Sequence, residues 1–112
     1  MTQNIRYAVD GDGIAILTID VADRPMNVIT PGFRAELAEC IDRLAGDASV
    51  RGAVLASGKS SFMAGADIKD MVNAYDRGIT LVEARDRVAL LTKLLRRVEA
   101  CGKPFAAAIH GV

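Results

Sequence analysis

The chain has 112 residues, of which 51% are hydrophobic and 25% are charged. This balance predicts one small globular domain with a modest core and argues against disorder. Fourteen basic residues balance fourteen acidic ones, so no overall electrostatic field favours nucleic acid as a partner.

Residues 5–19 have the pattern of a β-hairpin. The segment IRYAV at 5–9 alternates apolar and polar residues, DGDG at 10–13 has turn chemistry, and IAILTI at 14–19 is a second strand. Because this second strand is nearly all apolar, we expect it to be covered on both faces.

A helix is predicted over residues 30–46, after a loop at 20–29. Thr30 is a suitable N-cap, Pro31 suits the first helical position, and Gly46 can end the helix. Spacings of three and four residues give this helix one apolar face. That face consists of Phe33, Leu37, Cys40, Ile41 and Leu44.

The remaining elements complete an α/β pattern. The apolar segment at 50–56 predicts a buried strand, reached from the hairpin by a βαβ crossover. A small-residue loop follows, and a helical pattern runs over 67–71. A long helix is predicted over 80–101, opened by the capping box TLVE, and a strand of small residues is predicted over 104–110.

Cys40 and Cys101 fall in apolar, helix-like stretches, and we expect both to be buried reduced thiols. The single histidine, His110, excludes a His-rich metal site. The N-terminus lacks the pattern of a signal peptide, and no apolar stretch reaches the about 20 residues of a membrane span. We therefore expect a cytoplasmic protein.

The segment FMAGADIK at 62–69 has the strongest pattern for chemistry. Its small residues allow a ligand to approach the backbone, just before a helix begins. The first N–H groups of that helix lack internal partners and lie at the positive end of its dipole. They suit a phosphate or a carbonyl oxygen that becomes negative, with Lys69 as a nearby cation. The same spacing also occurs as ordinary packing geometry.

A nucleotide-binding phosphate loop is a weaker interpretation of the neighbouring residues. The sequence SGKS at 57–60 is similar to the end of such a loop. However, Ala53 replaces the upstream glycine, and no helix follows directly.

Three separated segments resemble the crotonase (enoyl-CoA hydratase/isomerase) superfamily. FMAGADIKDM at 62–71 resembles its signature F-x-A-G-A-D-I-K-E-M, RPMNVI at 24–29 its substrate loop, and KPFAAAIHGV at 103–112 its K-P-x-I-A-A-I-x-G strand. The chain is most similar to the hydratase portion of multifunctional fatty-acid oxidation proteins. The resemblance implies an α/β fold, the crotonase-like ββα spiral, with residues 1–112 forming an N-terminal part that ends before the glycine-rich catalytic turn.

The resemblance also implies roles for individual residues. The backbone N–H of Ala66 corresponds to one of two oxyanion-hole donors to the thioester oxygen of acyl-CoA, and the second corresponds to a position after Val112. His110 falls at a variable position, so we expect it to be structural. The residues implied to line bound CoA are Arg24, Pro25, Met26, Ala64, Asp67, Ile68 and Lys69.

Four of these implied ligand contacts have alternative roles. Asp67 is also suited to cap a helix, and Arg24 to be a surface loop charge. Lys69 has the alternative of a solvated helix lysine. For Met26 we favour a position in the core.

The implied activity is that of an enoyl-CoA hydratase, which adds water to a trans-2-enoyl-CoA in fatty-acid β-oxidation. CoA enters as part of the substrate, so no separate cofactor or metal is expected. The family's two acid–base glutamates correspond to positions after Val112, while the glutamates of the predicted helices fall on polar faces: Glu36, Glu39, Glu83 and Glu99. We therefore expect these 112 residues alone to be inactive, and the parent enzyme to be a homo-oligomer.

Two alternatives remain open for the function. One is another acyl-CoA enzyme of the same superfamily, such as an isomerase. The other is a non-catalytic module that self-associates through exposed apolar surface.

Overall fold

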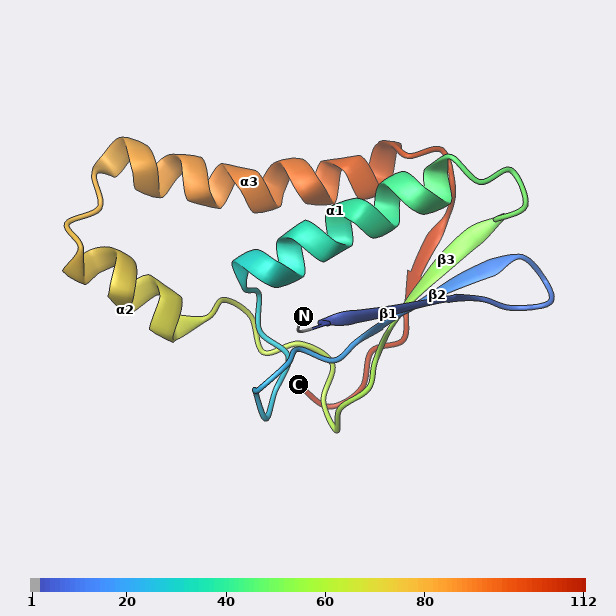
Figure 1. Ribbon diagram of the computed structural model, residues 1–112, viewed down its shortest axis with the longest axis horizontal. Coiled ribbons are helices and arrows are strands. Elements are labelled where there is room, and N and C mark those ends of the chain that lie inside the picture. Colours follow the sequence, from blue (N-terminus) through green and yellow to red (C-terminus); the bar gives the residue numbers. More distant parts are fainter. Residues whose placement is uncertain (1–2) are drawn as a thin grey trace.

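The computed structural model describes residues 3–112, and within them one sheet of four strands forms the base of the fold (Figure 1). The strands are β1 (Ile5–Val9), β2 (Ile14–Ile19), β3 (Gly52–Ser57) and β4 (Phe105–Ala107), in that order across the sheet. β1 and β2 are antiparallel, whereas β3 runs parallel to both β2 and β4. The mixed sheet confirms the predicted α/β class, including the hairpin and the βαβ crossover.

Helix α1 (Pro31–Ala45) makes this crossover and covers one face of the sheet. Thr30 caps it by accepting a hydrogen bond from the N–H of Phe33 at 3.1 Å, and Pro31 occupies the first turn. The predicted apolar face is buried, and it meets alternate residues of β2 in the core. The core residues shared by these two elements are Ala15, Leu17, Ile19, Phe33, Leu37, Cys40, Ile41 and Leu44.

The two faces of β2 differ in burial within this chain. Ala15, Leu17 and Ile19 are buried beneath α1, whereas the residues between them are only half-buried. The expectation that β2 is covered on both faces is therefore wrong for the described residues. Side chains alternate across a strand, so the one helical layer covers only every second residue.

Helices α2 (Ile68–Asp76) and α3 (Leu81–Ala100) extend away from the sheet (Figure 1). α2 continues five residues past the predicted end at Met71. In α3 the capping box is present, because Thr80 accepts from the N–H of Glu83 and Glu83 accepts from that of Thr80. Of the described α3 residues only Leu94 is buried, and the apolar side chains of Leu81, Val88, Leu90 and Leu95 are exposed.

The last segment departs from the predicted strand over 104–110. β4 spans only Phe105–Ala107, because the chain then leaves β3 and runs beside residues 62–63 instead. Just before β4, the Nζ of Lys103 donates to the carbonyl oxygens of Leu44 and Asp47 at the C-terminal end of α1.

Both cysteines are free: Cys40 is buried, as predicted, while Cys101 is only half-buried. Burial raises the pKa of the Cys40 thiol, which keeps it protonated at neutral pH. Within residues 3–112, no helix combines the length and apolar character that crossing a membrane requires.

Candidate functional site

Two loops that are far apart in the sequence lie side by side beyond the ends of β2 and β3. The N–H of Ala64 donates to the carbonyl oxygen of Asn27, and the N–H of Ile29 donates to that of Gly65, both at 2.8 Å. Ile29 and Ala66 also form an isolated parallel bridge. The structure therefore joins the 24–29 loop to the 62–69 turn, which the sequence had singled out separately.

The 62–69 turn exposes the backbone around Ala66. Gly65 has a φ of 99°, and a Cβ at this position would meet no atom within 4 Å beyond its chain neighbours, so glycine is required by conformation rather than by space. Ala66 is exposed, and among residues 3–112 its N–H has no hydrogen-bond partner. A free donor therefore lies immediately before the N-cap of α2.

The side chain of Asn27 holds the two loops to the sheet. It is fully buried, its Oδ1 accepts from the N–H of Val21 at 2.9 Å, and its Nδ2 donates to the carbonyl oxygens of Ile19 and Phe62. The same Nδ2 lies 2.9 Å from the Oγ of Ser57. One amide thus connects the ends of β2 and β3 with both loops.

Asp67 has two partners that fix its carboxylate. It caps α2 by accepting from the N–H of Lys69 at 3.1 Å, and it forms a two-bond ion pair with the guanidinium of Arg24 at 2.9 and 2.7 Å. The Asp67 side chain is only 6% exposed. The hydrogen bonds from Arg24 hold the pKa of the Asp67 carboxyl below its usual range.

A second group of charges holds the 20–29 loop from the other side. The Nζ of Lys59 donates to Asp20 at 2.7 Å and to the carbonyl oxygen of Arg24 at 2.9 Å. Asp20 also pairs with the more exposed Arg6. The hydrogen bond from Lys59 is the main cause that lowers the pKa of Asp20.

For three of the predicted ligand contacts, the structure distinguishes between the alternative roles. Asp67 does cap α2, and Arg24 is a half-buried ion-pair partner rather than a surface loop charge. Met26 is 36% exposed, so the favoured core position is wrong: the loop turns its side chain outward. The remaining predicted contacts border the turn, and Pro25, Ala64, Ile68 and Lys69 are all exposed.

Three residues of this network had no assigned role in the sequence prediction: Asn27, Ser57 and Lys59. In the sequence, Asn27 appears only as one residue of the 24–29 motif. A polar residue followed directly by the apolar pair Val28 and Ile29 is the one local feature that indicates a buried side chain with internal hydrogen bonds. Lys59 and Ser57 belong to the segment SGKS at 57–60, which is similar to the end of a phosphate loop. The structure shows Lys59 directed at Asp20 and the Arg24 carbonyl oxygen instead.

The segment 110–112 lies beside the start of the turn. The N–H of Phe62 lies within hydrogen-bond distance of the carbonyl oxygens of His110 and Val112, and the N–H of Met63 donates to Val112 at 3.0 Å. The His110 ring is exposed and lies 3.0 Å from the carbonyl oxygen of Lys59. The structural role of His110 stays a prediction.

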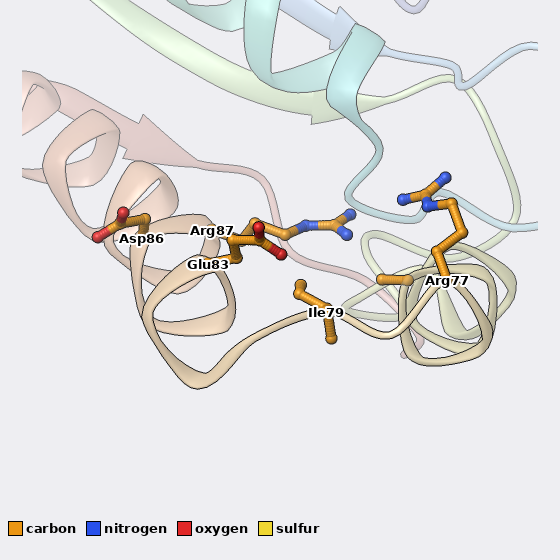
Figure 2. Close-up of a pocket in the computed structure, with 6 residues that line it drawn as sticks. Arg77, Ile79, Glu83, Asp86 and Arg87 are labelled. Carbon is orange, nitrogen blue, oxygen red and sulfur yellow. The ribbon is translucent and has the colours of Figure 1, made fainter.

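A separate cavity of about 360 Å³ lies between α2 and α3 (Figure 2). Arg77 borders it from the end of α2, Ile79 from the connection, and Glu83 and Arg87 from α3. Two of its charges already have partners, because Arg87 contacts Asp70 and Glu83 belongs to the capping box of α3. None of its lining residues belongs to the 62–69 turn.

Chemically, the turn offers a backbone donor to an oxygen that gains negative charge. The unpaired N–H of Ala66 stands beside the N-terminus of α2, whose dipole adds partial positive charge. Carbonyl and thioester oxygens are acceptors of this kind.

Comparison with known proteins identifies the family. A model of the enoyl-CoA hydratase/isomerase family matches residues 11–112. The chain belongs to the enoyl-CoA hydratase/isomerase family. This confirms the resemblance based on the three sequence segments.

Two curated relatives support the same assignment, and a solved structure shares the fold. The chain is 38% identical over 114 residues to the fatty acid oxidation complex subunit alpha of Idiomarina loihiensis, covering 99% of this chain and 16% of that protein. It is 42% identical over 104 residues to the subunit of the same name in Shewanella oneidensis, covering 89% of this chain and 14% of that protein. An enoyl-CoA hydratase/isomerase (crotonase) structure of Legionella pneumophila shares the fold, with a TM-score of 0.83 at 24% identity, over 96% of this chain and 40% of that one. The chain therefore spans a small part of the length of these relatives.

Proposed function

We propose that this chain supplies one oxyanion donor, the N–H of Ala66, to an enoyl-CoA hydratase that acts in fatty-acid oxidation. The observation that carries the proposal is the unpaired N–H of Ala66 in a turn held by Asn27 and by the Arg24–Asp67 ion pair. The relatives named fatty acid oxidation complex subunit alpha support the pathway.

In this proposal the thioester oxygen of a trans-2-enoyl-CoA accepts a hydrogen bond from the Ala66 N–H. Addition of water across the 2,3 double bond moves negative charge onto that oxygen, and a donor already in place stabilises this charge. The exposed residues that border the turn are proposed to face the CoA portion of the substrate: Pro25, Met26, Ala64, Ile68 and Lys69. CoA enters with the substrate, so the proposal includes no separate cofactor.

No carboxylate of this chain is proposed as the acid or base. The Asp67 carboxylate is held by Arg24, and that of Glu36 accepts hydrogen bonds from the N–H groups of Asn4 and Ile5 at 2.7 and 3.3 Å. We therefore expect the 112 residues assayed alone not to hydrate crotonyl-CoA above background.

Homo-oligomerisation and a cytoplasmic location are further parts of the proposal. Large apolar side chains on α2 and α3 are exposed, including Met71, Tyr75, Leu81 and Val88, and such surface favours association. The same observation supports a second candidate, a non-catalytic module that self-associates. Light scattering over a concentration series, combined with the activity assay, distinguishes an active oligomer from an inactive one.

The direct test follows the loss of crotonyl-CoA absorbance in the complete protein that carries this chain. Ala66→Pro removes the N–H, and we expect kcat to fall by about 10²- to 10³-fold. Ala66→Ser keeps the N–H and serves as the matched control, with activity near that of the wild type. Absence of hydration by the wild type would contradict the proposed function, and full activity of Ala66→Pro would contradict the role of this donor.

A further inference from the structure

We propose that Arg24 and Asp67 are positioning residues, whose ion pair holds the 62–69 turn against the 20–29 loop and so fixes the orientation of the Ala66 N–H. The catalytic consequence of this proposal rests on the proposed hydratase function. The structural part, which concerns how the two loops are held, does not.

The geometry of the pair restricts rotation as well as distance. Two parallel hydrogen bonds join the guanidinium to both carboxylate oxygens, at 2.9 and 2.7 Å, and a planar two-bond pair defines a relative orientation. Asp67 follows Ala66 directly, and its carboxylate also accepts from the N–H of Lys69. A fixed Asp67 side chain therefore limits movement of the peptide that precedes it.

Arg24 is held at its other end as well. Its carbonyl oxygen accepts from the Nζ of Lys59, which is only 14% exposed and also pairs with Asp20. Contacts therefore run without a break from Asp20 and Lys59 through Arg24 to Asp67. The Arg24 guanidinium therefore binds the Asp67 carboxylate of the same chain. The family resemblance had instead implied a contact between Arg24 and CoA.

Burial makes the pair difficult to replace by water. The side chains of Arg24 and Asp67 are 28% and 6% exposed, so removal of the arginine leaves a largely buried carboxylate without its cation. The turn would then have to move for that carboxylate to reach solvent. Movement of the turn shifts Ala66, and a displacement of about 1 Å in a positioned group can reduce a rate about 100-fold.

The test uses the complete protein with Arg24→Met and Asp67→Asn, which break the pair from opposite sides. Asparagine at this position still offers a capping oxygen, so Asp67→Asn separates the ion pair from the helix cap. We expect kcat for crotonyl-CoA hydration to fall about 10- to 100-fold, with a much smaller change in KM. The double variant should be no slower than Arg24→Met alone, because the two residues act as one unit.

Two further variants control for charge and for folding. Arg24→Lys keeps the charge but not the two-bond geometry, and it should recover only part of the lost kcat. Arg6→Met removes an exposed partner of Asp20 from the same charged group, and its kcat should stay within about 2-fold of the wild type. Equal losses in Arg6→Met and Arg24→Met would overturn the proposal.

Hydrogen exchange provides a measurement that does not depend on activity. The N–H groups of Ala64 and Ile29 bridge the two loops, and we expect both to exchange about 10-fold faster or more in Arg24→Met. Unchanged exchange overturns the proposal whether or not the protein is a hydratase. Faster exchange with unchanged kcat overturns the positioning role, whereas an inactive wild type contradicts only the proposed function and leaves exchange to decide how the loops are held.

Discussion

The N–H of Ala64 donates to the carbonyl oxygen of Asn27 at 2.8 Å, while the Asn27 side chain accepts from the N–H of Val21 at 2.9 Å. One buried residue therefore binds the candidate oxyanion turn with its backbone and organises the 20–29 loop with its side chain. This dual contact explains how a turn made of small, exposed residues keeps a defined shape, because its order comes from a neighbouring loop rather than from its own side chains.

Asn27→Ala should destabilise the protein markedly. The substitution leaves the N–H of Val21 and the carbonyl oxygen of Phe62 without a partner, whereas the carbonyl oxygen of Ile19 still accepts from the N–H of Gly58. Unsatisfied buried polar groups cost about 1–3 kcal/mol each. We expect a loss of about 2–4 kcal/mol in the free energy of unfolding, measured by urea denaturation. Asn73→Ala, at an exposed position of α2, is the control and should change stability little. Equal effects at both positions would contradict the bridging role of Asn27.

Gly65→Ala tests whether glycine is needed at this position for its backbone conformation or for lack of room for a side chain. No atom hinders a Cβ at Gly65 or at Gly11, but only Gly65 has a positive φ, of 99°. We expect Gly65→Ala to lower stability by about 1–2 kcal/mol through backbone strain, and to reduce the rate of hydration by displacing Ala66. Gly11→Ala should leave both unchanged in the same urea and activity measurements. A neutral Gly65→Ala would mean that the turn adopts another conformation in solution.

The sequence predicted the framework of the fold because local patterns decide it. The helix over 30–46 was recognisable from the Thr30 cap and one apolar face, and the capping box at residues 80–83 marked the start of α3. The strand over 104–110 was predicted too long, because its small residues suit a strand but the chain turns away after Ala107 to meet Phe62. That choice depends on a tertiary contact that no local pattern contains.

The candidate site shows the same limit. The family motif identified Ala66, but the pairing of Arg24 with Asp67 joins residues 43 positions apart, and residue spacing does not predict such a contact. Met26 was expected in the core because methionine is apolar, yet the loop that Asn27 and Lys59 hold turns it outward. Roles that depend on which loop lies beside which were therefore the ones that needed the structure.

Lys103→Met should weaken the junction between α1 and β4. The Lys103 Nζ donates to the carbonyl oxygens of Leu44 and Asp47. These oxygens also accept from the backbone N–H groups of Asp47 and Val50, so Lys103 adds a second hydrogen bond to each. Methionine keeps much of the apolar stem but makes neither bond, so we expect a loss of about 1–2 kcal/mol in the free energy of unfolding. Lys93→Met, at an exposed position on α3, is the control. Equal stability of the two variants would show that Lys103 is solvated.

The Asp67 ion pair should make stability depend on pH in the acid range. Its carboxyl has a lowered pKa in the folded state, chiefly through the hydrogen bonds from Arg24, and a normal value of about 3.9 in the unfolded chain. The unfolded state then takes up the proton first as pH falls, so the stabilisation is complete above about pH 4–5 and is lost as pH falls through the folded pKa. Asp67→Asn cannot titrate, and urea unfolding should show its deficit relative to the wild type shrinking between neutral pH and about pH 3. A deficit for Asp67→Asn that stays constant with pH would contradict the ion pair.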